Sequence, residues 1–144
     1  MAFKKIKQQL RQRRLAKAGI KIDLNISSVA YGARSGIWTI APHLLPEDCI
    51  VYSAGVGNNI RWDLEIIAHH RALVYAFDPT PRTVEWISEQ DLPGSFNFFP
   101  LGLSNRDGEM DFIEPNRTYK FNYRSGGVIP AGTRSVACEV RRLA

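Results

Sequence analysis

The chain has 144 residues, of which 44% are hydrophobic and 23% are charged, and its formal net charge is +5. This length and composition predict one globular domain with its own core. They exclude a membrane-spanning chain, since no apolar run is long enough, and the first residues lack the apolar core of a secretory signal. Cys49 and Cys138 form no Cys-x-x-Cys pair, so we expect reduced thiols and a cytoplasmic protein.

Positive charge is concentrated at the N-terminus. Residues 1–21 contain eight basic side chains and no acid, whereas the rest of the chain has 11 basic and 14 acidic side chains. Phe3, Ile6 and Leu10 have helical spacing and predict a basic helix in a leader that covers residues 1–30. We favour a solvated leader that docks its apolar stripe on its own domain. No specific nucleic-acid partner is expected, and weak binding to an anionic membrane surface is the alternative.

The next segments predict a connector, a strand and a helix. Residues 31–47 are rich in Gly and Pro and predict a connector. The apolar run at residues 49–54 is typical of a strand buried on both faces. Asn58 or Asn59 can cap the following helix, in which apolar residues recur every three to four positions. These apolar residues are Ile60, Leu64 and Ile67.

Two further strands and a second helix follow. The segment "ALVYAFD" predicts a buried strand that ends at Asp78. Thr80 is a good N-cap and Pro81 fits the first helical position, so a helix begins there. The segment "FNFFPLGLS" predicts a third strand, with Pro100 at its end or at a bulge.

This order of elements predicts the fold class. The pattern strand-helix-strand-helix-strand favours a parallel sheet with right-handed crossovers. The later segments "EMDFIEP" and "SVACEVRRL" read as antiparallel additions, with a looser stretch between them. We therefore predict an α/β fold with a Rossmann-like sheet. No metal site is expected, because the adjacent His69 and His70 point to different faces of their helix.

The loop after the first strand is suited to a ligand. Gly55 and Gly57 let backbone amides approach a ligand at the start of a helix, where the dipole favours an anionic group. A dinucleotide site would need a third glycine at the position of Ile60. Asp78 lies 21 residues after Gly57, at the tip of the next strand. Its carboxylate can accept hydrogen bonds from the hydroxyls of a ribose, or it can cap the next helix.

Three segments together carry a family resemblance. The segments "VYSAGVGNNIRWDLEI", "VYAFDPTP" and "FFPLGLSNRDGEMDF" resemble the S-adenosylmethionine-dependent methyltransferases of the FkbM type. The resemblance extends over residues 31–144 and is closest to the branch whose first motif reads V-Y-S-x-G-V-G. It implies a class I methyltransferase sheet and methyl transfer to an oxygen of a small hydroxylated or sugar-like acceptor.

The resemblance also implies a set of cofactor-binding residues. The glycine loop would face the methionine part of S-adenosylmethionine, Asp78 would hold the ribose, and the third strand's tip would lie near the adenine. Asn59 stands where this branch usually has an acid, and Asp63 matches an acid of the branch's helix. No catalytic base is implied. The implied cofactor-binding residues are Ser53, Gly55, Gly57, Asn58, Asp78, Pro79, Leu103 and Ser104.

In FkbM-type proteins an acid-rich segment, Asp-x-Glu-Gly-Ala-Glu, follows the strand that "SVACEVRRL" resembles. The present sequence ends at Ala144, before such a segment. We therefore expect residues 31–144 to form a partial methyltransferase domain that is C-terminally incomplete and has little activity alone. The uncovered edge of such a sheet favours self-association. The alternatives are a non-catalytic nucleotide-binding fragment and an NAD-type oxidoreductase domain.

Overall fold

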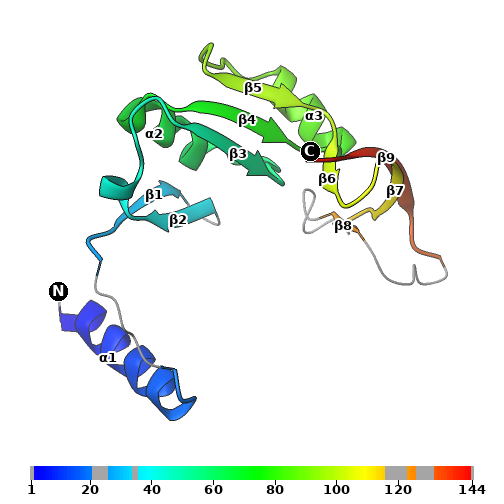
Figure 1. The fold of residues 1–144 in the computed structure, drawn as a ribbon. Coiled ribbons are helices and arrows are strands. Elements are labelled where there is room, and N and C mark those ends of the chain that lie inside the picture. Colours follow the sequence, from blue (N-terminus) through cyan, green and yellow to red (C-terminus); the bar gives the residue numbers. More distant parts are fainter. Residues whose placement is uncertain (1, 21–25, 34–35, 116–122, 126–131, 144) are drawn as a thin grey trace.

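The computed structural model describes residues 2–20, 26–33, 36–115, 123–125 and 132–143. The chain begins with helix α1 (Ala2–Lys17), which lies apart from the remainder of the molecule (Figure 1). Strands β1 (Val29–Ala33) and β2 (Gly36–Ile40) then form an antiparallel hairpin in which Tyr31 lies opposite Trp38. A short 3-10 helix (Pro42–Leu44) leads to the central sheet.

The centre of the molecule is a parallel sheet. Its three strands are β3 (Ile50–Ala54), β4 (Leu73–Phe77) and β5 (Phe96–Phe99), in the order β3-β4-β5. Helices α2 (Arg61–His70) and α3 (Pro81–Ser88) connect consecutive strands. The predicted parallel arrangement of three strands and two crossover helices is confirmed. The protein is thus a mixed α/β protein whose parallel sheet is compatible with a Rossmann-like fold.

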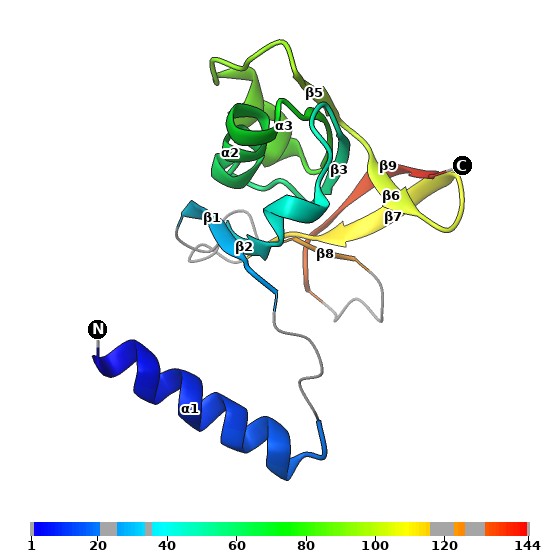
Figure 2. The ribbon, with the colours of Figure 1, turned by 60° about the vertical axis from the view of Figure 1, so that its left-hand side comes forward.

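The main hydrophobic core lies between this sheet and its two helices, which cover the same face (Figure 2). Val74 and Ala76 of β4 are fully buried against apolar side chains that include Ile60 and Ile87. Leu64 and Ile67 pack against this cluster, as their helical spacing predicts.

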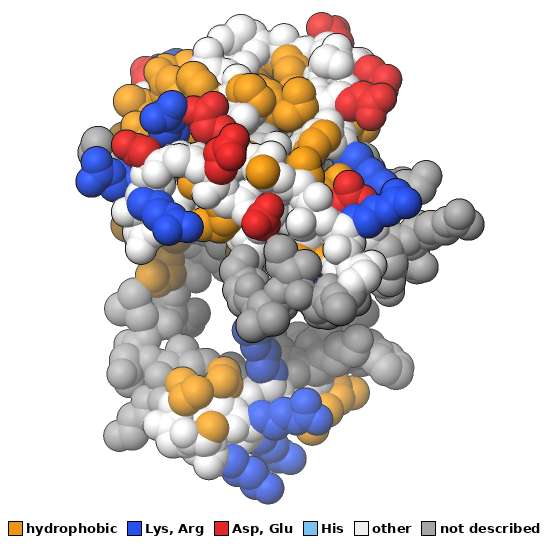
Figure 3. Space-filling view, turned by 90° about the vertical axis from the view of Figure 1, so that its right-hand side faces the viewer, with side chains coloured by type: hydrophobic (Ala, Val, Ile, Leu, Met, Phe, Trp, Pro, Cys, Tyr) orange, Lys and Arg blue, Asp and Glu red, His pale blue; other side chains and the backbone are white. Residues whose placement is uncertain are grey.

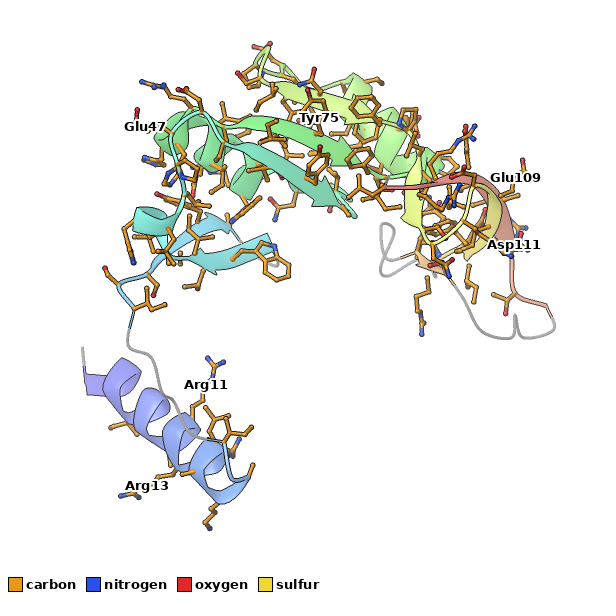
Figure 4. The ribbon with its side chains drawn as sticks, in the orientation of Figure 1. Arg11, Arg13, Glu47, Tyr75, Glu109 and Asp111 are labelled. Carbon is orange, nitrogen blue, oxygen red and sulfur yellow. The ribbon has the colours of Figure 1, made fainter. Side chains whose placement is uncertain are left out.

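The opposite face of the parallel sheet is an aromatic surface. Tyr52, Tyr75, Phe77 and Phe99 stack across the three strands, with ring centroids 5.3–6.2 Å apart. Figure 4 shows Tyr75 on this face, which is turned towards the viewer. Tyr52 is 55% exposed, so the prediction that the first strand is buried on both faces is wrong. Among the described strands, β3 and β5 form the two edges of this sheet.

A second sheet lies beyond the carboxyl ends of the parallel strands. Its strands β6 (Gly102–Ser104), β7 (Gly108–Ile113), β8 (Arg124–Ser125) and β9 (Ser135–Arg142) have the order β6-β9-β7-β8. The predicted antiparallel pairing holds for β7 with β9, and β7 also pairs antiparallel with β8, in the stretch that was read as loose. The pair β6 and β9 is parallel, which the sequence did not indicate.

The structure corrects local predictions in three segments. The segment at 31–47 is not only a connector, because it contains most of the β1–β2 hairpin. The third strand ends at Phe99, directly before Pro100, which agrees with one of the two predicted positions of this proline. The prediction that the same strand continues to Ser104 is wrong, because β6 belongs to the other sheet. Pro100 has no backbone N–H to donate to a ladder, which accounts for the break. The N-cap residue of α2 is Ile60 rather than Asn58 or Asn59, although the Asn59 Oδ1 accepts a hydrogen bond from the Arg61 amide at 3.2 Å.

Asn59 also joins the hairpin to the start of α2. Its side-chain amide donates to the Ala33 carbonyl at 2.8 Å. The Gly32 amide donates to the Glu65 carboxylate of α2 at 2.8 Å, and this bond lowers the pKa of Glu65. The ring of Tyr31 stacks on that of His69, with centroids 5.1 Å apart. The Tyr31 hydroxyl is hydrogen-bonded to Nε2 of the buried His70 at 3.3 Å. These contacts fix the hairpin to α2 and to Asn59.

Candidate functional site

A cavity of about 340 Å³ lies where the parallel sheet meets the second sheet. One wall is formed by the tips of β3 and β4, where open α/β sheets bind ligands. The other wall is formed by β6, β7 and β8. The lining residues are Ala54, Gly55, Gly57, Phe77, Asp78, Pro79, Thr80, Gly102, Leu103, Met110, Phe112, Tyr123 and Ser125.

The glycine loop needs its glycines for conformational reasons. Gly55 and Gly57 have φ of 75° and 59°, in the left-handed region that side chains disfavour. A Cβ added at Gly55 would meet no atom within 4 Å. The loop therefore leaves open space beside its backbone at the cavity, as close approach of a ligand requires.

Asp78 is buried and holds the glycine loop to the start of α3. Its Oδ2 accepts a hydrogen bond from the Gly57 amide at 2.9 Å. Its Oδ1 accepts from the Thr80 amide at 3.0 Å and from the Thr80 hydroxyl at 2.6 Å. The Thr83 hydroxyl lies 2.9 Å from that of Thr80 and extends the network. Thr80 is the N-cap residue of α3, as predicted, but its side chain makes no capping bond to the helix, and its hydroxyl donates to Asp78.

These bonds limit what Asp78 can offer a ligand. An ionised carboxylate has about four acceptor positions on its two oxygens. Three of them receive protein donors. About one position is left for a hydroxyl of a ligand, so binding both hydroxyls of a ribose would require a protein donor to give way.

The second sheet adds apolar and aromatic walls. Met110 and Phe112 of β7 and Tyr123 beside β8 line the cavity opposite the glycine loop. Burial raises the pKa of Tyr123, and the nearby Arg82 opposes the rise. Burial also raises the pKa of the Cys138 thiol on β9, and the carboxylates of Asp78 and Asp111 add to the rise. The Tyr123 phenol and the Cys138 thiol therefore both stay neutral at physiological pH.

The structure brings five of the eight predicted cofactor residues together. Gly55, Gly57, Asp78, Pro79 and Leu103 all line the cavity. Ser53, Asn58 and Ser104 are not among the lining residues. Alternation along β3 explains the case of Ser53, whose side chain points to the opposite face from Tyr52, towards α2.

Ser53 instead contacts a buried acid. Its hydroxyl is hydrogen-bonded to Asp63 in the first turn of α2. Burial raises the pKa of Asp63, and the Ser53 hydroxyl partly offsets the rise. One oxygen of Asp63 has no hydrogen-bond partner in the structure, which is consistent with a carboxyl group that favours its neutral form.

Apart from Leu103, the sequence analysis did not identify the cavity residues of the second sheet. Met110 and Phe112 alternate along a strand that was predicted, so their shared face could have been inferred. Tyr123 and Ser125 lie in a stretch that was read as loose, and no local signal indicates that they reach the cavity. Such contacts depend on which strands pair, and pairing is not visible in a short sequence window.

Comparison of the chain with family models, curated proteins and solved structures gives no significant match. Within the described ranges, every helix is too short or too polar to cross a membrane. The function proposed below therefore depends on the cavity and on the motifs that surround it.

Proposed function

We propose that the cavity binds S-adenosylmethionine and that the body of the chain is the cofactor-binding unit of a methyltransferase of the FkbM type. The observation that carries this proposal is the position of Asp78. This residue is buried at the tip of β4, accepts a hydrogen bond from the glycine loop and lines the cavity. The cavity volume of about 340 Å³ lies within the range of small-molecule sites.

The residues present fit the chemical groups of this cofactor. Gly55 leaves room for the amino acid part beside the backbone, and the remaining acceptor position of Asp78 suits one ribose hydroxyl. Leu103, Met110 and Phe112 offer apolar surface to a purine ring. The absence of a third glycine, at the position of Ile60, disfavours a dinucleotide.

When bound, S-adenosylmethionine supplies an electrophilic methyl group. The role of the chain in such a reaction is to hold the cofactor and an acceptor hydroxyl in line and to exclude water. The acceptor class, a small hydroxylated or sugar-like molecule, is part of the same proposal. No residue is assigned as a catalytic base.

The test is calorimetric titration of the full chain with S-adenosylmethionine and, separately, with NAD. We expect binding of S-adenosylmethionine and weaker or no binding of NAD. Loss of a hydrogen bond to a charged group costs about 1.5–3 kcal/mol, so Asp78→Ala should weaken S-adenosylmethionine binding at least about tenfold.

Because Asp78 also has three internal bonds, a control for lost stability is needed. Thr83→Ala removes a buried hydroxyl of the same network that does not line the cavity. This variant should lose stability but keep its affinity for the cofactor. Equal affinity in Asp78→Ala and the parent chain would remove Asp78 from the site, and preference for NAD would replace the proposal with the oxidoreductase alternative.

A further inference from the structure

Charge divides the chain into two parts. Residues 1–46, here called the N-terminal segment, have nine basic side chains and one acidic side chain. Residues 47–144, here called the body, have ten basic and thirteen acidic side chains. Figure 3 shows Lys and Arg on α1 without acids, whereas both signs are interspersed over the body. The N-terminal segment is therefore suited to an anionic partner.

Exposed apolar side chains are concentrated in the same segment. Of the twelve large hydrophobic side chains exposed among the described residues, eight lie between residues 6 and 44. Ile6 and Leu10 are 52% and 53% exposed, so the predicted docking of the α1 stripe on its own domain is wrong. The other six are Ile20, Ile26, Val29, Ile37, Trp38 and Leu44.

The hairpin presents its exposed residues from a fixed support. The contacts of Tyr31 and Gly32 with α2 hold β1 against the body. On the paired strand, Ile37 and Trp38 are 53% and 66% exposed, and Leu44 just beyond it is 64% exposed. Large apolar side chains held in water on a rigid support are typical of an interaction site.

We propose that the N-terminal segment binds the surface of an anionic lipid bilayer. Helix α1 contributes cations together with the short apolar stripe of Ile6 and Leu10. The hairpin and the 3-10 turn contribute Trp38, Ile37 and Leu44 for insertion at the level of the headgroups. Two such signals, charge and apolar insertion, are what stable interfacial binding requires.

The exposed side chains favour lipid over nucleic acid. Single-stranded nucleic acid is bound by aromatic side chains on which bases stack. Seven of the eight exposed residues are aliphatic, and Trp38 is the aromatic one. Aliphatic side chains gain free energy from insertion among acyl chains but offer no surface for base stacking. Arg11 and Arg13 project from α1 in different directions (Figure 4).

The test uses the full chain and vesicles of phosphatidylcholine with and without phosphatidylserine. We expect sedimentation with the anionic vesicles, little with the neutral ones, and weakening as salt rises. Trp62 and Trp86 are partly buried, whereas Trp38 is exposed, so Trp38 is a natural reporter. Its fluorescence should shift to the blue on binding, and Trp38→Phe should lose most of this shift.

Matched variants distinguish binding by the N-terminal segment from non-specific binding by any charged or apolar surface of the protein. Each basic side chain near an anionic surface is worth about fivefold in affinity, so Arg11→Glu with Arg13→Glu should weaken vesicle binding at least about tenfold. Arg106→Glu with Arg134→Glu changes the net charge equally on exposed positions of the body and should have little effect. Ile37→Ser should weaken binding more than Ile50→Ser, although both side chains are similarly exposed, at 53% and 58%.

Equal loss in the two charge variants would overturn the proposal, as would equal binding to neutral vesicles. Tight binding to a single-stranded oligonucleotide that the Arg11 and Arg13 variant loses, with no vesicle binding, would replace lipid by nucleic acid. Circular dichroism of every variant ensures that a loss of binding is not a loss of fold.

Discussion

The N-terminal segment and the body use their apolar residues in opposite ways. In the body, Ile66, Val74 and Ala76 are fully buried between the parallel sheet and its helices. In the N-terminal segment, residues of the same types, such as Ile6 and Ile37, are more than half exposed. Apolar content alone therefore does not distinguish a core from an interaction surface. The charge around each set of residues does, because eight of the segment's nine cations lie within its first 21 residues.

The same substitution in both regions should have very different effects. Ile66 has no exposed surface, whereas Ile6 is 52% exposed. Ile66→Ala should lower the free energy of unfolding by about 2–5 kcal/mol, because it leaves a cavity in the core. Ile6→Ala should change it by less than about 0.5 kcal/mol. Urea denaturation of both variants checks this, and similar losses would mean that α1 packs on the body.

Asp78 should be the most costly polar residue of the cavity to replace. Asp78→Ala leaves the buried donors of Gly57 and Thr80 without their acceptor. Each unsatisfied buried group costs about 1–3 kcal/mol, so the variant should unfold at clearly lower temperature than the parent chain. Calorimetry would measure the change. A melting temperature equal to that of the parent would show that the network at the tip of β4 is not formed.

Some features of the fold could be predicted from the sequence and others could not. The apolar runs in β3 and β4, the turn glycines and Asp78 at a strand tip are local patterns, and they predicted the parallel unit correctly. The hairpin was missed because its Gly-containing strands resemble a connector and its pairing depends on α2. The end of β5 at Pro100 was one of the predicted alternatives, because proline has no N–H to donate, but the partner of β6 could not be predicted, since β9 begins more than 30 residues later.

The burial of Asp63 gives the body a pH dependence of its own. Its pKa is raised above the ordinary value of 3.8 by burial, so the folded state keeps this proton to a higher pH than the unfolded state. The contribution to stability is present below pH 3.8 and is lost as pH rises through the folded pKa. Asp63→Asn should remove this loss, so its stability relative to the parent chain should increase between pH 4 and neutral pH.

Thermal melts of both proteins across this pH range check the prediction. The pKa values of Asp48 and Glu65 are lowered, by Arg71 and by the Gly32 amide respectively, and act in the opposite direction. The difference between the two proteins, rather than either curve alone, isolates Asp63. Parallel curves for Asp63→Asn and the parent chain would show that this carboxyl is ionised in the folded protein.

Removal of residues 1–21 should have the smallest effect on the body. Ile6, Leu10 and Ile20 are all more than half exposed, so their loss removes little buried surface. We expect a melting temperature within a few degrees of the parent and unchanged affinity for S-adenosylmethionine, measured by calorimetry. A large loss of stability would mean that the leader is part of the core.

The proposal that the body rather than the N-terminal segment binds the cofactor is tested most directly by a residue-resolved NMR titration with S-adenosylmethionine. Amide shifts should cluster at Gly55, Gly57, Asp78 and Leu103, which line the cavity. Amides of α1 and the hairpin should not move. Saturable shifts at these cavity positions alone would support the assignment. No shifts, or shifts concentrated in α1 and the hairpin, would contradict it.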